Sequence, residues 1–133
     1  MENFLAPWRQ QILSIFRIMV GLVILQFGLA KIFKFPAVGM FAKVTPLSWP
    51  GGYAGLIELV FGTLLVIGLF SRVAAFILSG LMAFAYFLGH AGGGFFPILN
   101  GGNLAVVLCF AFLYLAAAGP GPLSVDAIVR DKE

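Results

Sequence analysis

The chain has 133 residues, of which 62% are hydrophobic and only 10% are charged, and its mean hydropathy is +1.08. A soluble domain carries about 25% charged residues, because its surface needs polar side chains, so this composition excludes both an ordinary globular protein and a disordered chain. The net charge is +3, but the eight basic residues are scattered singly beside apolar runs, which excludes nucleic acid as a partner.

Four apolar segments follow one another along the chain. Each has close to the roughly 20 residues that a helix needs to cross about 30 Å of hydrocarbon. They predict an all-α fold, an integral membrane four-helix bundle, in which residues 1–133 form a single domain. The predicted spans cover residues 12–33, 53–70, 73–89 and 101–118. The first is too long for the core of a signal peptide, about 7–15 residues, so we expect it to remain a span.

The connections between the spans differ in kind. Phe70-Ser71-Arg72 joins the second and third spans and is short enough to force an antiparallel hairpin, with Arg72 at its tip. Residues 34–52 and 91–100 are broken by proline and glycine but are still apolar, which favours segments that lie in the membrane interface.

Orientation follows from the distribution of lysine and arginine, which is biased toward the cytoplasmic side of a membrane. Five basic residues fall on one side of the predicted bundle and three on the other. The larger group is Arg9, Arg17, Arg72, Arg130 and Lys132, and the smaller is Lys31, Lys34 and Lys43. We therefore expect a multi-pass protein of the bacterial inner membrane with both termini in the cytoplasm.

Polar side chains inside an apolar bundle are informative, because lipid makes them costly. Five of them fall at similar depth toward the outward ends of the spans and form a candidate ligand-binding layer. These are Gln26, Lys31, Glu58, His90 and Asn103. Glu58 with Lys31 is either a structural pair between the first two spans or part of a ligand or proton site. His90 is either a polar cap at the interface or else a proton carrier or ligand contact.

A second layer, with a structural role, holds Arg17, Arg72 and Asp126 at the cytoplasmic ends. Lys31 follows Arg17 by 14 residues, about 21 Å along a helix, so we expect both side chains to snorkel to the interface.

Small residues on the first two spans predict close packing between them. Gly21 and Gly28 share nearly one face of the first span, and Gly55 and Gly62 share one face of the second, which allows the helix backbones to approach. Cys109, the single cysteine, is expected to be a packing residue. The sequence contains no metal-binding signature and encodes no cofactor site of a recognised type.

Several of these residues recur together in a known family. The chain resembles the DoxX family of small four-helix bacterial membrane proteins over nearly its whole length. The resemblance is carried by Arg17 with Gly21, Gly28-Leu29-Ala30-Lys31, Gly55-Leu56-Ile57-Glu58 with Gly62, Gly68-Leu69-Phe70-Ser71-Arg72, Asn100-Gly101-Gly102 and Gly119-Pro120-Gly121-Pro122-Leu123-Ser124-Val125-Asp126. In the family a glutamate often follows Asn-Gly-Gly, whereas this chain has Asn103. That departure implies that a proton-binding or cation-binding role of the glutamate is lost here or moved to Glu58.

The resemblance implies a membrane subunit or accessory protein of a redox-linked complex, since some relatives look like membrane subunits of quinone-linked thiosulfate or redox-protective complexes. A quinone would bind near the outer layer, with Lys31, Glu58, His90 and Asn103 as hydrogen-bonding groups. The expected partners are the lipid bilayer, an oxidoreductase subunit and a second copy in a homo-oligomer. Two alternatives stay open: a small-solute transporter with Glu58 as coupling carboxylate, and a structural anchor that holds a soluble partner through residues 126–133. Catalytic residues and enzymatic activity are not assigned.

Overall fold

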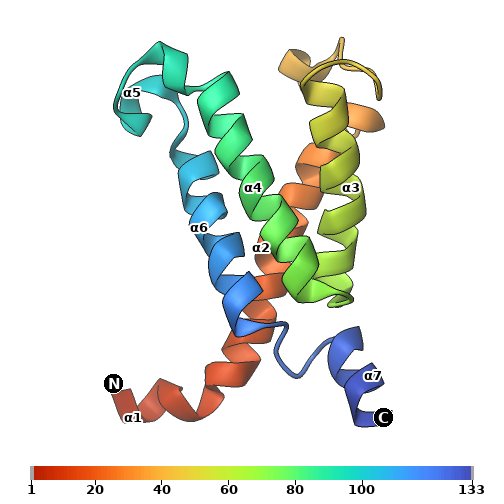
Figure 1. Ribbon diagram of the computed structural model, residues 1–133, viewed down its shortest axis with the longest axis vertical. Helices are drawn as coiled ribbons and strands as arrows, with labels where there is room; N and C mark the ends of the chain where they lie inside the picture. The colour runs from red at the N-terminus through yellow and green to blue at the C-terminus, as the bar shows by residue number, and fades with distance from the viewer. Residues whose placement is uncertain (1, 133) are drawn as a thin grey trace.

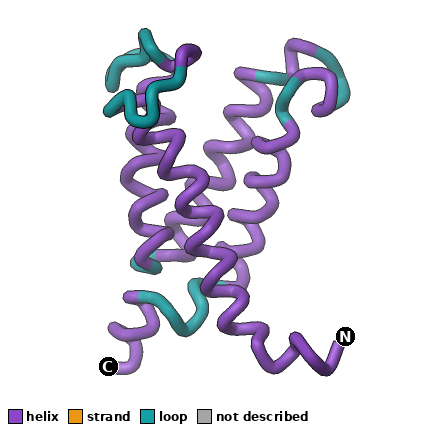
Figure 2. The backbone as a smooth tube through the Cα atoms, turned by 180° about the vertical axis from the view of Figure 1, so that it is seen from behind, coloured by secondary structure: helices purple, strands orange, loops and turns teal. Residues whose placement is uncertain are grey.

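The computed structural model describes residues 2–132, which contain helices and no β-strand (Figures 1 and 2). Four long helices lie side by side, and short helices flank them. The long helices are α2 (Arg9–Ile32), α3 (Gly51–Ile67), α4 (Ser71–Gly89) and α6 (Asn103–Ala118). The short ones are α1 (Glu2–Leu5), η1 (Ala6–Trp8), η2 (Gly39–Phe41), η3 (Ala91–Gly93), α5 (Pro97–Asn100) and α7 (Val125–Lys132). The all-helical prediction is confirmed.

The long helices pack as two close pairs, α2 with α3 and α4 with α6, and α3 also contacts α4. Both described chain ends lie at the same end of the molecule, at the bottom of Figure 1. We call this the terminal end and the opposite one the distal end. The distal ends of α2 and α3 lie on one side and those of α4 and α6 on the other (Figures 1 and 2).

Two helical segments, Ala6–Ile32 and Ser71–Gly93, are long and apolar enough to cross a membrane. The helices α3 and α6 are also apolar but shorter, with 17 and 16 residues, which is about 25 Å at 1.5 Å per residue. All four lie within three residues of the predicted spans.

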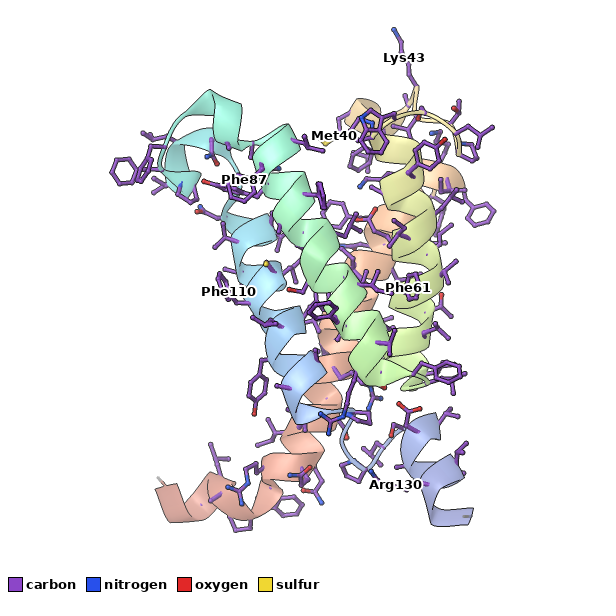
Figure 3. The ribbon with its side chains drawn as sticks, viewed as in Figure 1. Met40, Lys43, Phe61, Phe87, Phe110 and Arg130 are labelled. Carbon is purple, nitrogen blue, oxygen red and sulfur yellow. The ribbon has the colours of Figure 1, made fainter. Side chains whose placement is uncertain are left out.

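Apolar side chains occupy both the inside and the outside of the helix assembly. Its core is built around Ile24, Leu65, Leu78 and Phe112, each at most 1% exposed. Phe110, labelled in Figure 3, is nevertheless 64% exposed. An exterior of this kind is unfavourable in water and suits hydrocarbon.

Glycine lets α2 and α3 approach each other, as predicted. A Cβ atom on Gly28 would lie 2.8 Å from the Leu59 backbone nitrogen, and one on Gly21 would lie 2.9 Å from Val66 Cγ2. A Cβ atom on Gly62 would lie 3.1 Å from Ile24 Cγ2. The two backbones are therefore closer than any larger residue at these positions would allow.

The hairpin between α3 and α4 differs from the prediction. The connection is residues 68–70, so Arg72 lies in the first turn of α4 and not at the hairpin tip. The chain turns earlier because Gly68, with φ of +78°, adopts the left-handed conformation that ends α3.

Candidate functional site

A buried ion pair joins α2 and α3 toward the distal end. Lys31 Nζ lies 2.8 Å from Glu58 Oε1, with the Glu58 side chain 2% exposed and that of Lys31 14% exposed. The two meet because Gly55 precedes Glu58 by about one turn: a Cβ atom on Gly55 would lie only 3.0 Å from Lys31 Cβ. The sequence-based interpretation of a contact between these spans is matched by this geometry.

Two aromatic rings flank the same ammonium group. Lys31 Nζ lies 5.8 Å from the ring centroid of Phe27 and 5.3 Å from that of Phe41. The rings themselves meet edge to face, with centroids 6.3 Å apart. A cation over ring faces is attracted by the ring quadrupole, most strongly where water is excluded. Lys31 is thus held by one carboxylate and by two rings, one from its own helix and one from η2.

Lys34 secures the segment that carries Phe41. Its Nζ donates hydrogen bonds to the carbonyl oxygens of Lys31 at 2.7 Å and Phe41 at 2.8 Å, and also to that of Val44. From the sequence, Lys34 was interpreted only as a basic residue on the outward side of the membrane, and this role was missed. A lysine just past a helix end was the available signal, because such cations bind the last carbonyls of the helix.

The other members of the predicted outer layer do not join this pair in the described part of the chain. Gln26 is exposed on α2, and Asn103 is exposed at the first position of α6. His90 Nδ1 lies 3.2 Å from the Asn100 carbonyl oxygen, in a cluster of its own. There the Asn100 amide donates to Tyr86 Oη at 3.1 Å and to the Gly94 carbonyl at 3.0 Å, which orders the connection between α4 and α6.

Arg17 does not snorkel; its guanidinium group is buried at 1% exposure. It donates to the carbonyl oxygens of Leu65 at 2.9 Å, Val66 at 3.3 Å and Leu123 at 2.7 Å, and also to that of Pro120. The last carbonyls of a helix have no partner within the helix and carry the negative end of its dipole. The group therefore turns inward, because the end of α3 and the segment after α6 supply its acceptors.

Asp126 and Arg72 close two further helix ends. The Asp126 carboxylate accepts hydrogen bonds from the backbone N–H groups of Phe70 and Ser71, both at 2.9 Å, at the start of α4. Arg72 Nη1 donates to the carbonyls of Ala116 at 3.3 Å and Ala117 at 2.5 Å, at the end of α6. The three residues of the predicted inner layer thus each bind one helix terminus.

The environment of Asp126 favours its ionised form. Burial alone would raise the pKa of Asp126, but the N–H groups of Ser71 and Phe70, together with the positive charge of Arg17, outweigh burial and hold that pKa below its ordinary value. An anion at a helix N-terminus is also favoured by the helix dipole.

No group of three or more His, Cys, Asp or Glu side chains that could hold a metal occurs among the described residues. Cys109 is partly buried against the core, and its carbonyl accepts a hydrogen bond from Ser79 Oγ at 2.8 Å. Its place agrees with a packing role.

An apolar helical assembly with capped helix ends and one buried ion pair has the character of a membrane protein. The chain belongs to the DoxX family, whose proteins are membrane proteins: the DoxX family model matches residues 12–91, and the model described as TQO small subunit DoxD matches residues 53–133. The resemblance seen in the sequence is therefore confirmed.

Two relatives come from Haemophilus influenzae, and both are described only as uncharacterized proteins. The first is 39% identical over 137 residues, which covers 93% of this chain and 95% of the relative. The second is 33% identical over 73 residues, which covers 55% of this chain and 48% of the relative. No solved structure matches the chain.

Proposed function

We propose that this protein is a membrane subunit or accessory protein of a redox-linked complex, and that it binds a quinone beside Lys31 and Glu58. The match of residues 53–133 to the small subunit DoxD of TQO supports the link to such a complex. The observation that carries the binding site is the buried Lys31–Glu58 pair with the rings of Phe27 and Phe41 beside it.

The residues at this position have the chemistry that a quinone head group requires. A quinone offers two carbonyl acceptors on a flat apolar ring. An ammonium group has three N–H donors, of which Glu58 uses one, and the remaining exposure of Lys31 leaves a donor for a carbonyl. Phe27 and Phe41 supply aromatic surface for the ring. His90 and Asn103 lie outside this group and are not part of the proposed site.

Quinone binding tests the proposal directly. The full chain, purified in mild detergent, should be stabilised against heat by a short-chain ubiquinone analogue. Lys31→Met should abolish that shift, and Lys43→Met, which removes an exposed lysine of the distal loop, should keep it. A preparation without extractable quinone and without any quinone-induced shift would contradict the proposal, as would an unchanged shift in Lys31→Met.

We further propose that all four long helices span the bacterial inner membrane and that both termini are cytoplasmic. Support comes from the basic residues: Arg9, Arg72 and Arg130 belong to the terminal end, and Lys34 and Lys43 to the distal end. Figure 3 shows Arg130 and Lys43 at opposite ends of the molecule.

Thiol labelling of intact cells tests this orientation. In a Cys109→Ala background, Lys43→Cys should react with an impermeant maleimide from outside, whereas Arg130→Cys should react only after lysis. The reverse pattern would invert the orientation, and labelling of both from outside would exclude the three spans proposed between residues 43 and 130, because two sites on one side are separated by an even number of spans.

The two alternative functions, a transporter and a membrane anchor, predict different experimental results. A transporter coupled by Glu58 predicts solute flux in proteoliposomes that Glu58→Gln abolishes. An anchor for a soluble partner predicts loss of recruitment when the tail is removed. That deletion must begin at Arg130, because Asp126 binds the start of α4 and Ala127 is buried.

A further inference from the structure

A groove lies at the terminal end, between the first turns of α2 and the end of α6. It has a volume of about 610 Å³ and is lined by Arg9, Gln10, Ile12, Leu13, Phe16, Tyr114 and Ala118. Its floor is mostly apolar, and a single exposed cation, Arg9, stands among its lining residues. Neither the ion pair of Lys31 nor the helix caps use this surface.

A smaller and more polar hollow adjoins the groove. Its volume is about 190 Å³, and it shares Gln10 and Ala118 with the groove. Its other lining residues are Arg72, Pro120, Gly121, Pro122 and Arg130. The two hollows together present three arginines and a glutamine, and no carboxylate occurs among the described residues that line them. The described lining of the two hollows is therefore positively charged, and it adjoins the apolar groove.

We infer that the two hollows form a binding site for one anionic phospholipid. The head-group phosphate lies in the smaller hollow against Arg72, Arg130 and Gln10, and an acyl chain lies along Leu13, Phe16 and Tyr114 of the groove. Planar guanidinium groups bind phosphate oxygens with paired hydrogen bonds. Basic pockets beside membrane helices are a common place for acidic lipid head groups.

The combination of features selects a lipid over a soluble anion. A free phosphate would use the arginines but would leave the apolar lining of the groove uncovered. A neutral lipid would cover the groove but would leave the three cations without a counter-charge. Only a molecule with an anionic head and an apolar chain matches both parts of the surface.

Lipid titrations of the full-length protein in detergent test the inference. The probes are phosphatidylglycerol, phosphatidylcholine with the same acyl chains, and inorganic phosphate, and binding is measured by native mass spectrometry and thermal shift. Phosphatidylglycerol should bind more tightly than phosphatidylcholine. Arg130→Gln, which removes a cation from the smaller hollow, should weaken its binding roughly fivefold. Lys43→Gln, which removes an exposed cation at the distal end, should leave the affinity unchanged.

Three results would overturn the inference. Equal affinity for the two lipids would show that the arginines do not select an anionic head group. An equal loss in Lys43→Gln would show that total charge and not this surface attracts the lipid. A thermal shift with inorganic phosphate as large as that with phosphatidylglycerol would show that the surface binds anions in general and not a lipid.

Discussion

The Nε atom of Arg17 lies 2.9 Å from the carbonyl oxygen of Leu65, so a cation in α2 closes the C-terminal end of α3. With its other bonds, the guanidinium group satisfies four carbonyl oxygens from two distant parts of the chain. Arg17→Met would remove the side-chain donor of Val66 and Leu123 and would leave Leu65 and Pro120 only the bonds from the Gly68 N–H and Ser14 Oγ, at 3.2 and 3.5 Å. Each unsatisfied polar group costs about 1–3 kcal/mol.

We therefore expect Arg17→Met to lower the free energy of unfolding by about 3 kcal/mol or more, measured by denaturation in mixed micelles. The control is Lys43→Met, since Lys43 is an exposed cation outside both proposed binding sites, and its effect should stay within about 0.5 kcal/mol. Equal stability of the Arg17→Met protein and the wild type would refute the capping role.

The Asp126 carboxylate, which joins α7 to the start of α4, makes the stability of the protein depend on pH in the acid range. Its pKa is held below the ordinary value of 3.8, so its stabilising effect is fully present above that ordinary value and is lost as the pH falls through the folded-state pKa. Asp126→Asn removes the charge and leaves one acceptor oxygen for two N–H groups, so it should reduce stability by about 1 kcal/mol at neutral pH.

The difference in melting temperature between the wild type and Asp126→Asn, followed against pH, checks this prediction. It should be constant near neutrality and shrink below about pH 4. A difference that persists unchanged into strong acid would show that the charge of Asp126 does not contribute.

Gly28 sets the separation of α2 and α3. An alanine Cβ there would lie 2.8 Å from the Leu59 backbone nitrogen, and a backbone atom cannot move aside without parting the helices. Gly28→Ala should therefore destabilise the protein by about 1–3 kcal/mol. Gly80→Ala is the control: Gly80 lies within α4 and faces open space, so the better helix propensity of alanine should stabilise by up to about 1 kcal/mol. If both substitutions have the same sign in thermal denaturation, the close approach does not limit the fold.

Lys31 and Glu58 form a thermodynamic pair that a double-mutant cycle can measure. Lys31→Met and Glu58→Gln should each destabilise the protein, because a lone buried charge is worse than none, and the double variant should recover part of the loss. The expected coupling energy is about 1–3 kcal/mol. If Glu58 instead serves mainly a ligand or proton site, Glu58→Gln should leave stability nearly unchanged and abolish quinone binding. Additive losses would show that the contact contributes nothing.

The helices were predictable because hydropathy alone marks them, and the Lys31–Glu58 contact was predictable because both residues fall at one depth on antiparallel neighbours. The depth of a residue in the membrane, however, fixes only its position along the helix axis and not the direction in which its side chain points. The rotation of each helix about its axis turns Gln26 and Asn103 outward, so the expected layer of five residues does not assemble.

The environment of Arg17 was not predictable from local patterns. Two of its acceptors, Pro120 and Leu123, follow it by 103 and 106 residues, and backbone carbonyls have no signature in the sequence. The same holds for Asp126, whose partners belong to a turn 55 and 56 residues earlier. The predicted boundary of the hairpin was wrong because the left-handed Gly68 ends α3 sooner than hydropathy suggests.

The distance in sequence between Arg17 and its last acceptors has a consequence for biosynthesis. Leu65 and Val66 are translated about midway through the chain, but Pro120 and Leu123 leave the ribosome near the end. During most of translation α2 therefore carries the charge of Arg17 before all of its acceptor carbonyls have been synthesised. A stop at codon 119 would yield all four long helices, since α6 ends at Ala118, and would still leave that charge without the acceptors of Pro120 and Leu123.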